Sequence, residues 1–87
     1  MPYSIEILPS AAKQIAKLPK DVRRRVARRI DALAVNPRPH GVRQLHDVES
    51  LYRVRIGDYR IIYRIKDDRL IVVVVRVGHR RDVYRSL

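Results

Sequence analysis

The side chains best suited to chemistry in this sequence are the arginines of two stretches in its second half. The first stretch is LYRVRIGDYRIIYRI, residues 51–65, and the second is VGHRRDVY, residues 77–84. Sixteen of the twenty basic residues in the chain are arginine and only four are lysine. A planar guanidinium grips a phosphate through two hydrogen bonds and also stacks on bases. The arginine bias therefore favours nucleic acid as the partner, with an acidic protein as the alternative.

The first stretch predicts a β-hairpin whose register decides which arginines meet. Gly57-Asp58 is a two-residue turn signal between strands over 51–56 and 59–65, with glycine where positive φ is needed. In that register Arg55 lies directly opposite Arg60. The face that contains this pair carries four arginines: Arg53, Arg55, Arg60 and Arg64. Like charges opposite one another destabilise a sheet, and an anion across the face would reverse that effect. The alternative is a solvated face with splayed side chains.

The second stretch follows a strand expected over residues 70–77. It places His79, Arg80, Arg81 and Tyr84 at the end of that strand. A tyrosine can stack on a base or hydrogen-bond a ribose hydroxyl, and an arginine can hold a phosphate. For Tyr84 the alternative is a structural role, in which it pins the C-terminal tail to the sheet.

The remaining elements predict the scaffold that positions these residues. Alternating polarity predicts a strand over 3–7, and apolar residues at helical spacing predict helices over 9–18 and 21–35. Asp21 is a candidate N-cap or first-turn acid of the second helix. Tyr52, Val54, Ile61 and Tyr63 form an apolar hairpin face, expected under the helices. The order β-α-α-β-β-β predicts an α+β domain with a helical hairpin on one face of an antiparallel sheet. The strand over 70–77 is apolar on both faces and is expected inside that sheet.

Composition sets the class of protein. Eighty-seven residues make one domain over 1–87, and a net charge of +11 with 46% hydrophobic residues indicates a folded chain with an ionised surface. The absence of cysteine excludes disulfides and thiolate catalysis. The first eight residues, MPYSIEIL, lack the pattern of a signal peptide, and no apolar run spans a bilayer. We therefore expect a cytoplasmic protein with no membrane partner.

Other chemical constellations are weak in this sequence. The three glycines are too scattered for a phosphate-binding loop. His40 and His46 lie in or beside a proline-rich loop with few possible metal ligands nearby, which predicts a solvated loop. Asp47 and Glu49 are expected to neutralise local arginines. No metal site is predicted.

The two arginine-rich motifs resemble those of the RelE/ParE toxin superfamily, specifically its RelE branch. The resemblance extends over nearly the whole chain, from residue 3 to residue 84. It implies a RelE-like fold and a small toxin of a type II toxin–antitoxin module, which enters the ribosomal A site and cleaves the mRNA there. It also implies a hetero-oligomer with a cognate RelB-like antitoxin, and no cofactor.

The resemblance also implies roles for individual residues. The implied catalytic residues are Arg55, Arg60, His79, Arg80 and Tyr84. We further expect four arginines to bind RNA: Arg53, Arg64, Arg76 and Arg81. Cleavage of RNA without a metal uses the ribose 2′-OH as nucleophile, and cations stabilise the phosphoryl charge of the transition state. Arginine cannot serve as the general base. His79 is the first candidate for that base and Tyr84 the second, and the alternative for His79 is a passive place in the basic patch.

Two other functions stay open at this point. A ParE-like toxin would poison DNA gyrase by binding alone, and an inactive relative would act as a corepressor with its antitoxin. The five arginines of the helix over 21–35 have three possible partners: solvent, ribosomal RNA backbone or the acidic residues of an antitoxin.

Overall fold

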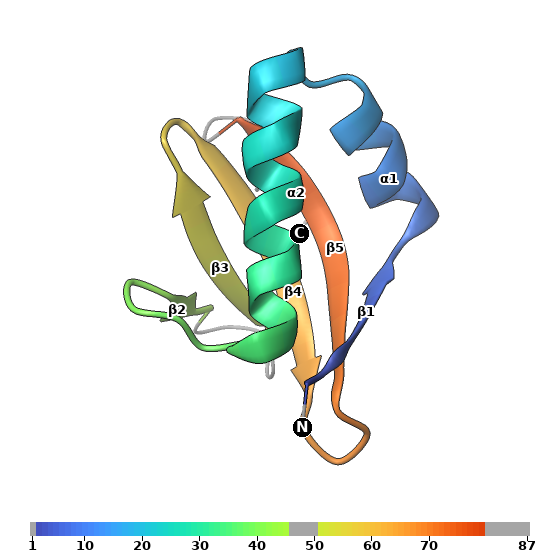
Figure 1. Cartoon of the computed structure of the whole chain (residues 1–87), viewed down its shortest axis with the longest axis vertical. Coiled ribbons are helices and arrows are strands. Elements are labelled where there is room, and N and C mark those ends of the chain that lie inside the picture. Colours follow the sequence, from blue (N-terminus) through green and yellow to red (C-terminus); the bar gives the residue numbers. More distant parts are fainter. Residues whose placement is uncertain (1, 46–50, 80–87) are drawn as a thin grey trace.

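The computed structural model describes residues 2–45 and 51–79 and has a five-stranded sheet with two helices on one face (Figure 1). Its elements in chain order are β1 (Ser4–Ile7), α1 (Pro9–Ala16), α2 (Lys20–Val35), β2 (Arg43–Gln44), β3 (Leu51–Ile56), β4 (Tyr59–Lys66) and β5 (Ile71–His79). The strands are arranged in the order β1-β5-β4-β3-β2. The predicted α+β class and the interior position of β5 are confirmed. Neither described helix is long and apolar enough to cross a membrane.

The sheet differs from the predicted antiparallel sheet in two ways. β1 runs parallel to β5, with Ile5 beside Val72, so the sheet is mixed. The two helices carry the chain from β1 to β2 at the opposite edge of the sheet, and β5, which pairs with β1, follows β3 and β4 along the chain. A fifth strand, β2, follows the proline-rich loop and pairs only with Tyr52 and Arg53 of β3. Two residues carry too little periodicity for β2 to be predicted.

The helices begin and end close to their predicted positions. α1 begins at Pro9, where the missing N–H is not needed. α2 begins at Lys20 without a side-chain cap, so Asp21 is not the N-cap but an acid in the first turn. There its negative charge interacts favourably with the helix dipole. Gln14 ties α1 to β5, because its Oε1 accepts a hydrogen bond from the Val77 backbone N–H at 2.9 Å.

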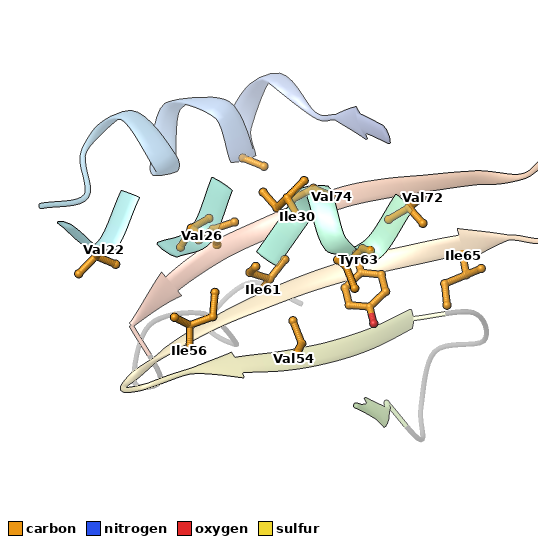
Figure 2. Packing of buried hydrophobic residues seen from close by; sticks show 13 residues of the cluster. Val22, Val26, Ile30, Val54, Ile56, Ile61, Tyr63, Ile65, Val72 and Val74 are labelled. Carbon is orange, nitrogen blue, oxygen red and sulfur yellow. The ribbon is translucent and has the colours of Figure 1, made fainter. Parts of the chain in front are cut away.

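The main core lies between α2 and the sheet (Figure 2). α2 buries the four residues that share one of its faces, Val22, Val26, Ile30 and Leu33. They pack over the helix-facing side chains of β3, β4 and β5, among which Ile61, Tyr63, Val72 and Val74 are completely buried. Each fully buried aliphatic side chain contributes roughly 1.5–3 kcal/mol by leaving water. The core therefore fixes which face of the hairpin is left for other uses.

The β3–β4 hairpin has the predicted register. Gly57 adopts a φ of +58° in the turn. Ile56 pairs with Tyr59, Val54 with Ile61, and Tyr52 with Tyr63. The rings of Tyr52 and Tyr63 stack with centroids 6.0 Å apart. The apolar hairpin face expected under the helices is thus confirmed.

Candidate functional site

The side of the sheet away from the helices carries a set of arginines, which we call the arginine face. Arg55 pairs with Arg60 across the hairpin, as predicted. Strand alternation and pairing put five arginines of β3, β4 and β5 on this side: Arg53, Arg55, Arg60, Arg64 and Arg76. The fold therefore brings together cations from three adjacent strands.

Arg60 is the unusual member of this face. Its Nε and Nη1 atoms are buried, and neither has a hydrogen-bond partner in the described structure. A buried donor without a partner costs about 1–3 kcal/mol, and more when the group is charged. Arg55, opposite it, is exposed and forms no ion pair with any described residue. Neither guanidinium group therefore has a carboxylate partner among the described residues.

A small apolar cluster lies on the same side of the sheet. Leu51 and Ile62 are buried there, with Leu45 and Val75 packed against them. The pairing places Ile62 directly opposite Arg53. The arginine face is thus a mixed surface, with aliphatic side chains among the cations. Such a surface suits a ligand that has both apolar rings and charged groups, as a nucleotide does.

His79 does not join the arginine face. Its ring packs edge-on against Tyr59, with centroids 5.7 Å apart, and Tyr59 belongs to the helix-side core. The cause is an irregularity in the β4–β5 register between Ile62 and Tyr63, where β5 carries one extra residue. The extra residue shifts the alternation, so Arg76 turns to the arginine face and His79 to the side of the helices. Simple alternation along β5 predicts the reverse for both.

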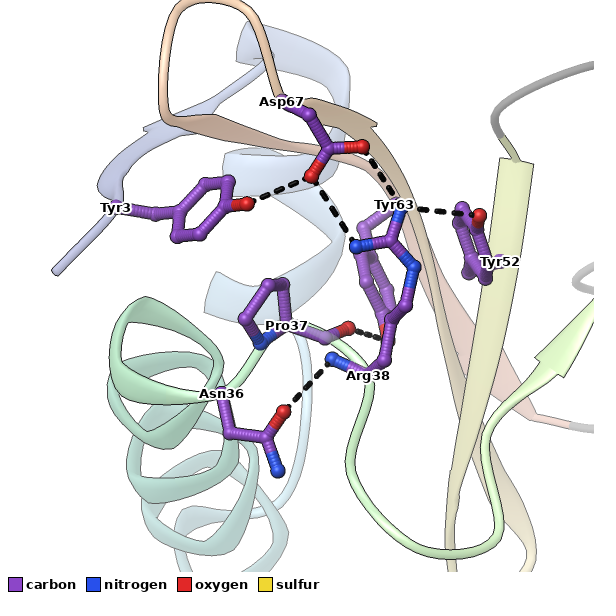
Figure 3. Close-up of polar contacts among 7 residues, drawn as sticks. All are labelled: Tyr3, Asn36, Pro37, Arg38, Tyr52, Tyr63 and Asp67. Carbon is purple, nitrogen blue, oxygen red and sulfur yellow. Dashed lines mark hydrogen bonds and ion pairs between the residues drawn. The ribbon is translucent and has the colours of Figure 1, made fainter. Parts of the chain in front are cut away.

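Another arginine, Arg38, lies on the helix-facing side of the sheet, at the end far from His79 (Figure 3). Arg38 donates to both carboxylate oxygens of Asp67, from Nη1 at 3.1 Å and from Nη2 at 2.8 Å. Nη2 also donates to the Tyr52 hydroxyl at 3.3 Å, and the guanidinium lies 5.2 Å from the centre of that ring. The Tyr3 hydroxyl donates to Asp67 Oδ1 at 2.6 Å. We call these four residues the Asp67 network.

The Asp67 network ties together the residue before β1, the loop after α2, β3 and the β4–β5 turn. The hydrogen bonds from Arg38 and from Tyr3 hold the pKa of Asp67 down to about 2. Beside the network, the buried Tyr63 hydroxyl donates to the Pro37 carbonyl oxygen at 2.7 Å, and burial raises the pKa of Tyr63. These contacts are all internal to the protein, so we attribute them to the fold.

Comparisons with known proteins agree with this architecture. Residues 5–84 match the family model described as the ParE toxin of the type II toxin–antitoxin system parDE. The chain belongs to the RelE/ParE family of toxins. It is 33% identical to the toxin RelG of Mycobacterium tuberculosis, over 98% of this chain and 99% of RelG.

Two further relatives indicate the RelE branch of this family. The mRNA interferase toxin RelE of Escherichia coli K12 is 26% identical, over 92% of this chain and 85% of that protein. The toxin chain in the crystal structure of an archaeal RelE–RelB complex from Pyrococcus horikoshii superimposes with a TM-score of 0.82. That superposition has 30% identity and covers 95% of this chain and 100% of the other. The chain is thus a RelE-type toxin of a toxin–antitoxin module.

Three of the predicted site residues of this RelE-type toxin, Arg80, Arg81 and Tyr84, lie outside the described residues. Of the others, the structure gathers Arg53, Arg55, Arg60, Arg64 and Arg76 on one side of the sheet and places His79 elsewhere. The gathered groups can neutralise a phosphate, but none of them can accept a proton near neutral pH.

Sequence reasoning missed one member of this surface. Arg43 of β2 pairs directly with Arg53 and extends the row of arginines beyond β3. Arg43, Gln44, Leu45 and Arg53 line a hollow at this edge. The only local signal was an arginine shortly after a Pro-Gly loop, which does not reveal strand pairing.

Proposed function

We propose that this RelE-type toxin inhibits translation by cleaving mRNA in the ribosomal A site. Three features support the proposal: the arginine face, the net charge of +11 and the similarity to an mRNA interferase of Escherichia coli. The ribosome would present the mRNA and confine cleavage to translated messages. A ParE-like action on DNA gyrase is less favoured, because relatives that carry RelE names match most of the chain.

Arg60 is the observation that carries the proposal. A protein under selection for stability alone gains nothing from burying two guanidinium donors without partners opposite another arginine. Phosphate oxygens can accept hydrogen bonds from both buried donors and neutralise the repulsion between Arg55 and Arg60. Burial also strengthens the attraction, because there is less water to screen it. The site is therefore organised for a phosphoryl group before RNA arrives.

The proposed reaction is transesterification within the RNA. The 2′-oxygen of the ribose attacks the adjacent phosphorus, and the bond between phosphorus and the 5′-oxygen of the next nucleotide breaks. The products are a 2′,3′-cyclic phosphate and a 5′-hydroxyl. A base takes the proton from the 2′-hydroxyl, and an acid supplies one to the leaving 5′-oxygen. Guanidinium groups supply the positive charge, so this chemistry requires no metal ion.

The arginines take the electrostatic part of this reaction. Arg55 and Arg60 stabilise the phosphoryl oxygens, whose negative charge is greatest in the transition state. Arg53, Arg64, Arg76 and Arg81 bind the flanking RNA. By resemblance, Arg80 contacts the phosphate or the leaving group. Tyr84 is placed at the 2′-hydroxyl, either to orient it or to stack on a base.

The packing of His79 against Tyr59 changes the proposal for the general base. A base must reach the 2′-hydroxyl within hydrogen-bonding distance. The ring of His79 lies on the helix side, whereas the buried donors of Arg60 belong to the arginine face. We therefore transfer the role of the base from His79 to Tyr84, the second candidate.

A RelB-like antitoxin is the proposed partner that keeps the toxin inactive in the cytoplasm. The related Pyrococcus horikoshii toxin forms a complex with RelB. An acidic segment of the antitoxin would complement the charge of this chain. We expect a hetero-oligomer in which the antitoxin excludes mRNA from the arginine face.

The function is tested by mapping mRNA 5′ ends by primer extension after induction of the toxin. Cells are compared with translation running and with translation blocked. We expect cleavages inside coding sequences that appear only while translation runs. Growth arrest with intact mRNA would overturn the proposal and favour DNA gyrase as the target, and intact mRNA without arrest would indicate an inactive relative.

A further inference from the structure

A second basic site lies beside the arginine face, at the edge of the sheet where α2 approaches β3. A groove of about 410 Å³ runs between α2 and the β3–β4 turn. Four arginines line it, together with two apolar side chains and one glycine: Arg25, Arg28, Arg29, Arg55, Ala32, Ile56 and Gly57. We call it the α2 groove. No acidic residue is among the described residues that line it.

The geometry of α2 concentrates these charges. Arg25, Arg28 and Arg29 are spaced at i, i+3 and i+4, so they share one flank of the helix. Ala32 continues this flank, which borders the buried face toward β3. Arg23 and Arg24 belong to the same helix and are exposed, but they do not line the groove.

At one end of the groove, the guanidinium of Arg25 lies against the β3–β4 turn. A side chain built on Gly57 would meet Nη2 of Arg25 at 3.4 Å. The bare backbone of Gly57 thus lets Arg25 lie close against the turn. Within the described part of the chain, no ion pair involves Arg25, Arg28 or Arg29. Because no described carboxylate pairs with these three guanidinium groups, their arrangement points to an anionic ligand from outside.

Arg55 connects the α2 groove with the arginine face. Its backbone pairs with Arg60 on the sheet, and Arg55, which is exposed, is also among the residues that line the groove. Among the described strands, only β2 pairs with the outer edge of β3, and it stops at Arg53. The edge beside Arg55 is therefore open among these strands, and Figure 1 shows β2 pairing near the far end of β3 from the turn.

We propose that the α2 groove binds the phosphodiester backbone of RNA that crosses the β3 edge from the arginine face. The inference rests on the proposed function, because it takes RNA as the ligand of the arginine face. RNA is preferred to an acidic peptide because the lining is entirely arginine among its basic residues, with aliphatic side chains on which a ribose or base can rest. The groove binds without reading sequence, since its donors face phosphates.

The test measures binding of the full-length chain to a fluorescein-labelled single-stranded 2′-O-methyl RNA by anisotropy at several KCl concentrations. This RNA cannot be cleaved because its 2′-oxygen is blocked. Each phosphate contact to single-stranded nucleic acid contributes about 0.7 to the slope of log affinity against log salt. The double variant Arg25→Ala/Arg28→Ala is therefore expected to reduce the slope by about 1.4.

Two matched variants make this result specific. Arg23→Ala/Arg24→Ala removes the same charge from the same helix outside the groove, and is expected to change the slope less than half as much. Arg25→Lys/Arg28→Lys retains the charge, and is expected to keep a slope close to that of the unmodified chain. Equal slope losses in the two alanine doubles would overturn the proposal, since charge anywhere on α2 would then suffice.

A competition experiment separates RNA from an acidic polypeptide. We expect a polyglutamate peptide to displace the RNA only at much higher charge concentration. Displacement at lower concentration, lost in Arg25→Ala/Arg28→Ala, would overturn the proposal and assign the groove to an acidic protein. The binding assay involves no cleavage, so the two proposals can fail separately. If mRNA is cleaved in cells but the two alanine doubles lose equal slope in vitro, only the proposal for the α2 groove is contradicted. If mRNA stays intact in cells but the slope loss is specific to Arg25→Ala/Arg28→Ala, only the proposed endonuclease activity is contradicted.

Discussion

Two arginines at opposite sides of the sheet show how the same side chain serves the fold in one place and a ligand in another. Arg38 lies on the helix-facing side and has a carboxylate, a hydroxyl and an aromatic ring as partners, all within the protein (Figure 3). Arg60 lies on the arginine face, with two buried nitrogens that have no hydrogen-bond partner in the described structure. Arg38 is therefore satisfied in the free protein, whereas the role that we propose for Arg60 is to bind an anion.

This difference predicts opposite responses to substitution in the two regions. A protein tolerates an unsatisfied charge at a functional site when the lost stability is regained on ligand binding. Changes at the Asp67 network should therefore alter stability without altering cleavage. Changes at Arg60 should slow cleavage strongly without reducing stability.

The largest expected effect is on catalysis. Arg60→Ala should slow mRNA cleavage on programmed ribosomes by roughly 10²–10³-fold, the typical effect of removing one preorganised donor to the transition state. Arg55→Ala should slow it less, because Arg55 is exposed and its charge is better screened. Single-turnover cleavage rates measure both effects. Arg69→Ala, which removes an exposed charge from the β4–β5 turn, should leave the rate unchanged.

The next largest effect is on stability, at the buried hydrogen bond beside the Asp67 network. Tyr63→Phe removes the donor to Pro37 and leaves a buried carbonyl oxygen unsatisfied, at a cost of about 1–2 kcal/mol. Urea unfolding measures this free energy. Tyr59→Phe is the control, because the Tyr59 hydroxyl makes no hydrogen bond within the described residues. If Tyr63→Phe also lost cleavage activity at equal protein level, the proposed division between a region that serves stability and the arginine face that serves cleavage would be contradicted.

The opposite sign is expected for the stability of an Arg60 variant. Arg60→Met keeps an unbranched side chain and removes the unsatisfied buried charge, so the free energy of unfolding should stay equal or rise by up to about 1 kcal/mol. Thermal and urea unfolding of the free protein measure it. A clear loss of stability would mean that Arg60 serves the fold.

The smallest effect is a dependence of stability on acid pH. The Arg38 guanidinium and the Tyr3 hydroxyl lower the pKa of Asp67 to about 2, below its usual value near 4. The stabilisation is therefore complete above pH 4 and is lost as the pH falls from 4 to 2. Asp67→Asn should lower the melting temperature near neutral pH and flatten the part of the stability profile between pH 4 and 2. A profile identical to that of the unmodified chain would contradict this role.

The local parts of the fold were predictable from the sequence. Gly57 fixed the hairpin turn, and strict alternation then set Arg55 opposite Arg60. The parallel pairing of β1 with β5 joins distant segments, so no local pattern predicts it. The run of valines in β5 also hides its extra residue, because valine suits either face of an interior strand.

The site was predictable in the same uneven way. The arginines of the hairpin followed from its register, whereas Arg76 and His79 depended on the irregularity in β5. The burial of Arg60 arises from packing in three dimensions, which alternation cannot reveal. The α2 groove required the placement of α2 beside the open edge of β3. The roles of Arg80 and Tyr84 still rest on resemblance alone.

The most direct measurement is the mapping of mRNA 5′ ends in cells that express Arg60→Met or Arg38→Met at equal protein level. Both variants lose one positive charge, from opposite sides of the sheet. The account predicts that translation-dependent ends disappear with Arg60→Met and persist with Arg38→Met. Persistence of those ends with Arg60→Met would contradict the assignment of the arginine face to RNA cleavage.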